Sequence, residues 1–222
     1  MSHQVVAIDG PAASGKSSTA RMVAERLGFC HVDSGSLYRA ATAAALRRSA
    51  DADRWSEEDV RRAVSDITLC AVAGAVVPLL AGEELGEELR GAEVTRHVSR
   101  VAQMPRIREW VNELVRSSAS SHSVVVDGRD IGTVVFPRAD LKVFLVADPW
   151  ERARRRLLQR SGQNPTDEDI AGETERLVLR DARDATQTVQ AKDAVLIDTT
   201  HLTQEAQVER IVALVKVLAP RK

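Results

Sequence analysis

The sequence predicts an α/β fold in which a parallel five-stranded sheet is covered by helices on both faces. Five short apolar segments are spaced along the 222-residue chain, and amphipathic helical patterns alternate with them. A glycine-rich stretch connects the first expected strand to the first expected helix. A chain of this length forms one domain, or one core with insertions.

The bulk composition is that of an ordinary globular protein, with 44% hydrophobic and 28% charged residues. The net charge of −1 gives no global attraction to nucleic acid or membranes, so any basic site must be local. Cys30 and Cys70 are too few and too far apart for a disulfide framework or a zinc knuckle. With no signal peptide and no long apolar run, we expect a cytoplasmic protein without a membrane anchor.

The glycine-rich stretch, residues 10–17, fits the phosphate-binding pattern G-x-x-x-x-G-K-[ST] between a strand at 4–9 and a helix at 18–27. Its glycines let successive backbone N–H groups point at anionic oxygens, and the helix N-terminus adds partial positive charge. Lys16 can reach the β- and γ-phosphates of ATP, and the Ser17 hydroxyl can ligate Mg²⁺. A plain Gly-Ser turn is the alternative. The predicted ATP-binding residues are Gly10, Pro11, Ala12, Ala13, Ser14, Gly15, Lys16, Ser17 and Ser18.

A second buried strand is expected at 29–32, followed by a helix to about Ser49. Polar residues at 33–39 lie where that strand ends, which is where ligands bind in open α/β sheets. A helix cap and turn explains Asp33, Ser34 and Gly35 as well. Ser56 is placed to cap a short helix over 57–65.

Residues 65–98 are expected to form an inserted subdomain within a core of 1–64 and 99–222. Two short strands, 67–72 and 75–80, form a hairpin, which does not continue a helix-crossed parallel sheet. Pro78 lacks a backbone N–H, so it predicts that its strand lies at a sheet edge.

The rest of the chain returns to the alternating pattern. Strands are expected at 123–126, 141–146 and 194–197, and helices at 106–118, at 151–160, after the cap Thr166 and after the cap Thr203. The arginine-rich segment of about 152–175 is expected to be a small, mobile lid.

Arginines gather at the expected strand ends and in the lid segment. Arginine binds phosphate bidentately and keeps its charge, so it suits two phosphorylated substrates that are brought together. Phosphoryl transfer is mostly positioning and charge neutralisation, which such a group can supply. A solvated helix face explains the cluster at 152–160 equally well. The arginines singled out are Arg39, Arg108, Arg129, Arg155, Arg156, Arg180 and Arg183.

Five segments resemble the bacterial cytidylate kinases: residues 10–17, 33–39, 98–108, 127–137 and 180–184. The run from Gly128 to Pro137, Gly-Arg-Asp-Ile-Gly-Thr-Val-Val-Phe-Pro, is highly specific to that family, and the similarity covers nearly the whole chain. The resemblance implies an adenylate-kinase-like P-loop fold whose insertion binds a nucleoside monophosphate (NMP). It also implies pyrimidine nucleotide metabolism: ATP with CMP or dCMP gives ADP with CDP or dCDP.

The same resemblance implies roles for individual residues and for the partners. Catalytic roles fall on Lys16, Arg129, Arg155 and Arg156, with Ser17 on Mg²⁺ and with Arg154 and Arg160 on or beside the lid. The CMP-binding residues are Ser34, Tyr38, Arg39, Ser99, Arg108, Asp127, Arg129, Asp130, Arg180 and Asp184. Of these, Arg39 and Arg129 would hold the CMP phosphate, Ser99, Arg108 and Asp130 would read the cytosine, and Arg180 and Asp184 would face the ribose. A monomer is expected, with ATP and CMP or dCMP as small-molecule partners and with no nucleic acid or membrane partner.

One region departs from the family pattern. Gln187 stands where the family usually has an arginine, and the segment 186–192 is shorter than the family's. We expect a nearby cation, Lys192 or Arg183, to cover part of the loss.

Two other activities fit the phosphate loop. A kinase of another small acceptor, such as shikimate or dephospho-coenzyme A, would share the loop and the core but would not need the insertion at 65–98. A nucleotide-dependent switch would bind and slowly hydrolyse ATP or GTP, but the chain has no Asn-Lys-x-Asp motif for reading guanine.

Overall fold

A computed structural model describes residues 3–218 of the chain. Its core is a row of five parallel strands in the order β2-β6-β1-β7-β8, as the sequence predicts. Because all five run the same way, their carboxyl ends meet at one edge of the sheet, where ligands bind in open α/β folds. The strands are β1 (Val5–Asp9), β2 (Cys30–Asp33), β6 (Val124–Gly128), β7 (Leu141–Val146) and β8 (Val195–Asp198).

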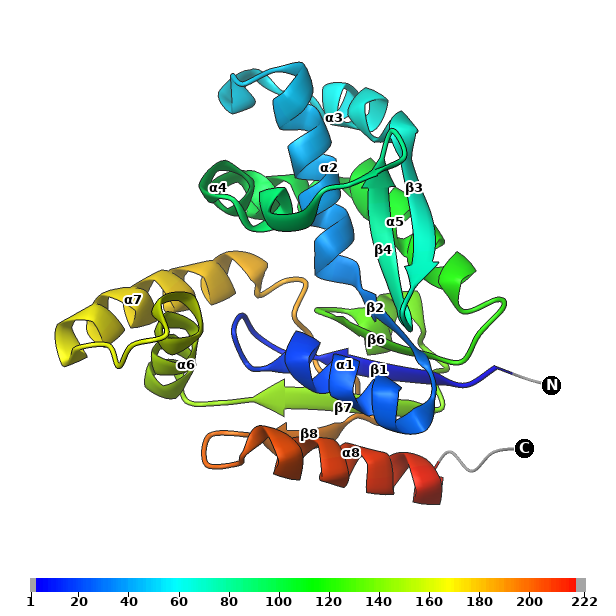
Figure 1. Ribbon diagram of the computed structural model, residues 1–222, viewed down its shortest axis with the longest axis vertical. Coiled ribbons are helices and arrows are strands. Elements are labelled where there is room, and N and C mark those ends of the chain that lie inside the picture. Colours follow the sequence, from blue (N-terminus) through cyan, green and yellow to red (C-terminus); the bar gives the residue numbers. More distant parts are fainter. Residues whose placement is uncertain (1–2, 219–222) are drawn as a thin grey trace.

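Helices cover both faces of this sheet (Figure 1). Helices α1 (Lys16–Leu27) and α8 (Gln204–Leu218) pack on one face through a cluster that includes Ile8 and Leu145. Helices α2 (Ser34–Arg48) and α5 (Pro105–Ser118) pack on the other face against the alternate strand residues, such as Val126. Covering on both faces explains why the five strands are apolar throughout.

The insertion builds a second core around the alanine-rich part of α2. This second core extends beyond the expected insertion at 65–98 on both sides. It contains α3 (Glu57–Ala63), the hairpin β3 (Ile67–Val72) and β4 (Ala75–Leu80), the short β5 (Glu83–Glu84) and α4 (Ala92–Val101). Its apolar cluster includes Trp55, Val60, Ile67, Leu80 and Val94. In Figure 1 the half of the molecule that contains this second core stands above the core sheet, and α2 extends from the end of β2 up into it.

The hairpin is not separate from the core sheet, so that part of the sequence interpretation is wrong. Strand β4 pairs in parallel with β2, with His31 opposite Ala75 and Val32 opposite Val76, and the whole sheet has eight strands. The prediction of an edge strand from Pro78 is also wrong. One side of β4 pairs with β3, and the other side pairs with β2 at 75–76 and with β5 at 79–80. Pro78 falls in the gap between those two pairings, where a missing N–H costs no ladder bond.

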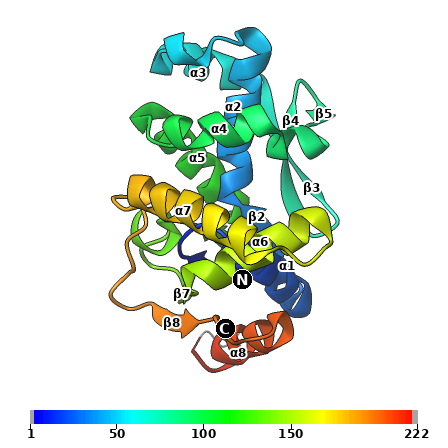
Figure 2. The same ribbon diagram turned by 90° about the vertical axis from the view of Figure 1, so that its left-hand side faces the viewer.

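Helices α6 (Pro149–Ser161) and α7 (Asp167–Asp184) form an antiparallel pair beside the sheet, and α7 lies between the insertion and the core in both views (Figures 1 and 2). The predicted caps are confirmed. Ser56 and Thr166 each form a capping box, with Asp59 and Asp169, and the Thr203 hydroxyl accepts from the N–H of Ala206. The sequence analysis missed α4 and a short π-helix at Ile131–Val135.

We expect Ile8→Ala to destabilise the fold strongly. Ile8 is fully buried in the central strand β1, and its truncation leaves a cavity that costs about 2–5 kcal/mol. Chemical denaturation measures the loss. The control is Leu196→Ala in β8, whose side chain is 55% exposed and whose truncation should change stability by less than about 0.5 kcal/mol. Equal losses in both variants would contradict the assignment of the core.

Candidate active site

The loop at residues 10–17 has a backbone that two of its glycines make possible. Gly10 has φ 149°, and a Cβ atom there would lie 2.1 Å from the main-chain oxygen of Leu145, so β7 packs directly against the loop. Gly15 has φ 89° and is the N-cap of α1. Ala13 also has a left-handed φ, 57°. This conformation turns the loop over the N-terminus of α1, where anions bind.

Lys16 is buried under this loop, with 6% of its surface exposed. Its Nζ donates to the main-chain oxygen of Pro11 at 2.5 Å and to Ser14 Oγ at 3.4 Å. Burial, and then the charge of Arg129, hold the pKa of Lys16 well below its ordinary value. Phosphate oxygens would oppose both effects, so the site is prepared for an anionic group.

The carboxylate of Asp127, at the end of β6, lies beside the first turn of α1. Its Oδ2 accepts from Ser17 Oγ at 2.5 Å, and its Oδ1 is 2.7 Å from His31 Nε2. Its main-chain oxygen accepts from Ser34 Oγ at 2.8 Å. Asp127 was predicted to bind CMP, but in the structure it lies against Ser17, the residue predicted to ligate Mg²⁺. His31 was not among the predicted site residues, although a polar residue in an apolar strand is a signal that could have identified it.

Asp9, which the sequence analysis also missed, links the phosphate loop to the segment that follows β6. Its carboxylate accepts from the N–H groups of Ile131 at 2.8 Å and Gly132 at 2.7 Å. Burial raises the pKa of Asp9 to about 6. These two bonds cap the π-helix and so fix Arg129 and Asp130, which immediately precede it.

A cavity of 400 Å³ opens beside this segment and contains the expected base-reading pair. The Arg108 guanidinium donates to Asp130 Oδ2, to Gln187 Oε1 at 2.9 Å and to the main-chain oxygen of Ala102 at 3.0 Å. The same guanidinium lies 6.0 Å from the centre of the Tyr38 ring. Burial raises the pKa of Asp130, and Arg108 opposes that shift. The cavity is lined by Arg108, Asp130, Thr133, Val134, Thr186, Gln187 and Val189.

The cation beside Gln187 is therefore Arg108. The proposed substitutes, Arg183 and Lys192, are both exposed, and the structure does not bring either of them to Gln187 within residues 3–218. A glutamine at this position accepts a hydrogen bond from Arg108, which an arginine could not do. The expectation that Lys192 or Arg183 covers part of the loss of an arginine at position 187 stays a prediction.

Two partly buried arginines share one carboxylate near the loop. Asp184 Oδ2 lies 3.5 Å from Arg129 Nε and 3.8 Å from Arg180 Nε, and Arg129 Nη1 donates to the main-chain oxygen of Gly10 at 3.2 Å. Both Nε atoms are buried and have no hydrogen-bond partner among the described residues. Burial, and then Arg129, lower the pKa of Arg180. Two cations against one carboxylate leave positive charge for an anionic ligand.

The remaining predicted CMP-binding residues are placed less closely. Arg39 Nη1 donates to the main-chain oxygen of Leu89 at 3.0 Å and to Thr95 Oγ1 at 3.2 Å. Burial, followed by the charge of Arg180, lowers the pKa of Arg39 to about 10. Ser99 lies on α4, and no hydrogen bond within residues 3–218 joins it to Arg108 or Asp130.

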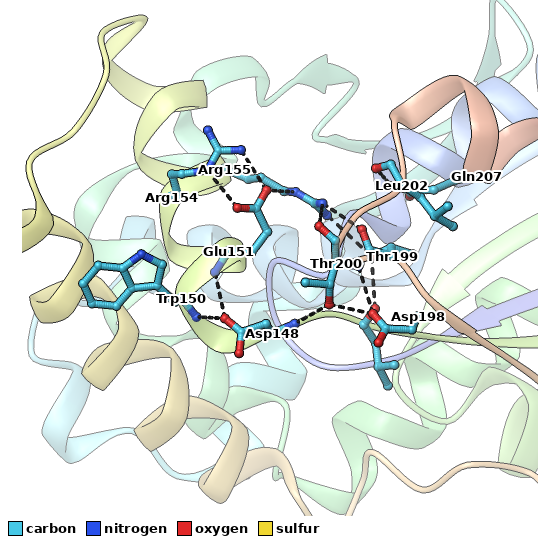
Figure 3. A network of polar contacts seen from close by, with 11 residues as sticks. Asp148, Trp150, Glu151, Arg154, Arg155, Asp198, Thr199, Thr200, Leu202 and Gln207 are labelled. Carbon is cyan, nitrogen blue, oxygen red and sulfur yellow. Dashed lines mark hydrogen bonds and ion pairs between the residues drawn. The ribbon is translucent and has the colours of Figure 1, made fainter.

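The lid arginines divide into two groups. Arg155, predicted to be catalytic, donates to the main-chain oxygens of Thr199 at 2.7 Å and Thr200 at 2.9 Å and pairs with Glu151, as Figure 3 shows. Arg154 pairs with the same glutamate. These contacts fasten α6 to the segment after β8, and none of the contacts described for Arg155 reaches the loop at 10–17. Arg156 and Arg160 instead face Glu173 on α7.

The fifth arginine of α6, Arg152, was not among the predicted site residues, and it touches the phosphate loop directly. Its Nη1 donates to the main-chain oxygen of Ala12 at 2.8 Å and to Asp181 Oδ2 at 2.6 Å. Asp181 Oδ1 accepts from the N–H of Ala12 at 2.9 Å. Both lid helices are thereby bonded to one residue of the loop.

Comparisons with known proteins show the family of this chain. A family model described as cytidylate kinase matches residues 6–217. The chain belongs to the cytidylate kinase family. A cytidylate kinase of Limosilactobacillus fermentum is 42% identical over 212 residues, which cover 93% of this chain and 92% of that protein. One of Chloroherpeton thalassium is 39% identical over 217 residues, which cover 95% and 92%.

Among solved structures, an uncharacterized protein from Eubacterium ventriosum covers 97% of this chain and 99% of that chain, with a TM-score of 0.53 and 12% identity. At that identity the likeness shows the fold alone. The family membership confirms the predicted enzyme class, a cytidylate kinase, and the predicted reaction, ATP-dependent phosphorylation of CMP or dCMP.

Asp33 at the N-cap of α2 supplies a pH-dependence prediction. Burial, and then the charge of Asp127, raise its pKa from 3.8 to about 6, while its carboxylate accepts from the N–H of Ser36. Between these two pKa values the folded state therefore binds more protons at Asp33 than the unfolded state does. The free energy of unfolding falls as pH rises through this range, and the full destabilisation is present above about pH 6.

Asp33→Asn keeps a capping side chain and removes the buried charge. At about pH 7.5 we expect the variant to be more stable than the wild type by on the order of 1–2 kcal/mol, and at about pH 4 we expect the difference to vanish. Denaturant titrations at both pH values measure it. A difference that is the same at both values would show that Asp33 is not titrating as described.

Proposed function

We propose that this cytidylate kinase binds ATP on the loop at 10–17 and the base of CMP or dCMP in the cavity of Arg108 and Asp130. The observation that carries the proposal is the placement of two consecutive residues. Arg129 donates to Gly10 of the phosphate loop, and Asp130 pairs with Arg108 in the cavity. A monophosphate whose base occupies the cavity can thus direct its phosphate toward the loop.

Charge neutralisation is the protein's main contribution to such a transfer. Lys16 serves the β- and γ-phosphates of ATP, and their negative charge would raise its depressed pKa again. Arg129 and Arg180 serve the acceptor phosphate, because each has a buried Nε without a hydrogen-bond partner among the described residues. Asp184 pairs with both of these cations and orients them.

The residues at the start of α1 fit Mg²⁺. A hydroxyl oxygen of Ser17 and a carboxylate oxygen of Asp127 lie together, and Mg²⁺ prefers such oxygen ligands together with substrate phosphates. No group of three or more His, Cys, Asp or Glu within residues 3–218 is arranged to hold a metal, in keeping with one or two protein ligands. When bound, Mg²⁺ would neutralise charge on the β- and γ-phosphates.

The domain roles follow from the same proposal. The insertion 65–98 would close on the monophosphate and the lid segment of about 152–175 would close on ATP, and closure would exclude water that otherwise hydrolyses ATP. From the sequence, we propose a monomer that resides in the cytoplasm and has no nucleic-acid partner. No helix within residues 3–218 is long and apolar enough to cross a membrane.

An ADP-release assay with a panel of acceptors tests the proposal. With ATP present, CMP or dCMP should stimulate ADP release strongly, and UMP, AMP and shikimate should do so much less. Hydrolysis at the same rate without any acceptor would favour a nucleotide switch. Strong stimulation by shikimate alone would assign the cavity to another acceptor.

Lys16→Ala should nearly abolish turnover and leave the fold intact. Removing one charge contact from the transferring phosphates costs about 10²–10³ in rate. Steady-state kcat for CMP measures the loss, and thermal unfolding checks the fold. Lys216→Ala, in the last helix, is the control and should keep full activity. A Lys16→Ala protein with more than a tenth of wild-type turnover would contradict the role of the loop.

Asp130→Asn should narrow the preference for CMP over UMP. A carboxylate only accepts hydrogen bonds, so it suits the 4-amino group of cytosine and opposes the 4-carbonyl of uracil. We expect a wild-type CMP:UMP ratio of kcat/KM on the order of 10² or more, since water relaxes part of the mismatch. In the variant CMP should lose far more kcat/KM than UMP does.

The matched control is Val134→Ala, which changes an apolar wall of the same cavity and should leave the CMP:UMP ratio unchanged. An unchanged ratio in Asp130→Asn would mean that Asp130 only pairs with Arg108 and does not read the base.

A further inference from the structure

His31 is a buried polar residue for which the proposed reaction has no role. It lies in β2, and its side chain is 4% exposed. Its Nε2 is 2.7 Å from Oδ1 of Asp127, whose side chain is 3% exposed. The neighbouring residues Cys30 and Val32 face the opposite side of the strand and pack in an apolar cluster.

The other groups around Asp127 determine what His31 does. Oδ2 of Asp127 accepts from the Ser17 hydroxyl, and its main-chain oxygen accepts from the Ser34 hydroxyl. Only Oδ1 remains, and the imidazole supplies a donor to it when its proton is on Nε2. With both carboxylate oxygens bonded, the carboxylate plane is fixed and Oδ2 stays turned toward Ser17.

We propose that His31 is a positioning residue that acts through Asp127 to hold the metal-binding carboxylate in place. This inference rests on the proposed function, because it takes Ser17 and Asp127 as the residues that face Mg²⁺ and ATP. His31 itself touches neither substrate. Hydrogen bonds of this kind to a ligating carboxylate fix its orientation, and their loss typically costs 10–100-fold in metal affinity or activity.

A purely structural role is the alternative to be separated from this one. A buried polar pair contributes little net stability compared with apolar residues of the same size, so the contact is not explained by the folding of β2. The same residue also anchors the insertion through its main chain, since its N–H donates to the oxygen of Gly74 at 2.8 Å. Substituting the side chain leaves that backbone bond in place.

Two substitutions test the side chain at matched polarity. In His31→Gln the amide nitrogen can reach Asp127 Oδ1, whereas in His31→Asn the side chain is one methylene shorter and cannot. Calorimetry measures the affinity for ADP with and without Mg²⁺. We expect the affinity for ADP without Mg²⁺ to be unchanged in both variants. The gain in ADP affinity that Mg²⁺ gives should fall about tenfold in His31→Asn, and most of that gain should return in His31→Gln. Cys30→Ala is the control and should keep the whole gain.

A double-mutant cycle tests whether the effect passes through Asp127. In an Asp127→Asn background, His31→Asn should cause no further loss of the gain from Mg²⁺. A further loss would overturn the proposal. So would a lower melting temperature of His31→Asn together with an unchanged Mg²⁺ dependence, because that result describes a structural pair.

A measurement on the wild type covers the case in which His31→Asn does not fold. In nitrogen NMR of the ADP complex, the His31 ring should carry its proton on Nε2, and its resonances should shift when Mg²⁺ is added. No shift would overturn the proposal. This titration uses ADP and Mg²⁺ without any acceptor, so it is distinct from the acceptor assay. A wild type that fails to phosphorylate CMP would refute the proposed function, and the Mg²⁺ result could still be interpreted.

Discussion

The burial of one ammonium group, that of Lys16, is the constraint on which the rest of the site depends. A buried cation is costly unless charges and hydrogen-bond acceptors surround it, and here the acceptors are Pro11 and Ser14, with the negative charges of Asp127 and Asp9 nearby. The charges of Arg129 and Arg180 act against it. Burial and these two arginines together disfavour the charged form of Lys16. A polyphosphate bound at the loop, as proposed, would supply negative charge that favours the charged form of Lys16, so substrate binding would also settle the charge balance of the site.

The parallel core was predictable because its signals are local. Five apolar runs, the caps Ser56 and Thr166 and the loop at 10–17 are each readable within a few residues. The attachment of the hairpin was not, because the pairing of His31 with Ala75 depends on which strand edge is free after folding. The π-helix at Ile131–Val135 was missed for a related reason. Its N–H groups are bonded by Asp9, far away in the sequence.

The same distinction divides the site residues. Arg108 and Asp130 lie in separate motifs, and the family resemblance assigns both to the base; they do meet in one cavity. His31, Asp9 and Arg152 were missed because their partners are a distant carboxylate or main-chain atoms of other segments. Arg155 shows the converse. It lies in an arginine-rich helix of the expected kind, yet its donors are bound to the main chain after β8. Charge in the sequence therefore marked the arginine-rich helix α6 but did not say which of its arginines contacts the loop at 10–17.

Helix α7 connects the two halves of the site by a short stretch of its last turns. Asp181 bonds the main chain of Ala12 in the ATP loop, while Arg180 and Asp184 lie with Arg129 where the acceptor phosphate is proposed to bind. Because a helix is stiff over one turn, a shift of the loop at Ala12 must move Arg180 and Asp184 as well. Arg152 extends the same connection to α6. In the proposed function, occupation of the loop at 10–17 would therefore bear on the position of the cations that receive the acceptor phosphate, as a transfer that must wait for both substrates requires.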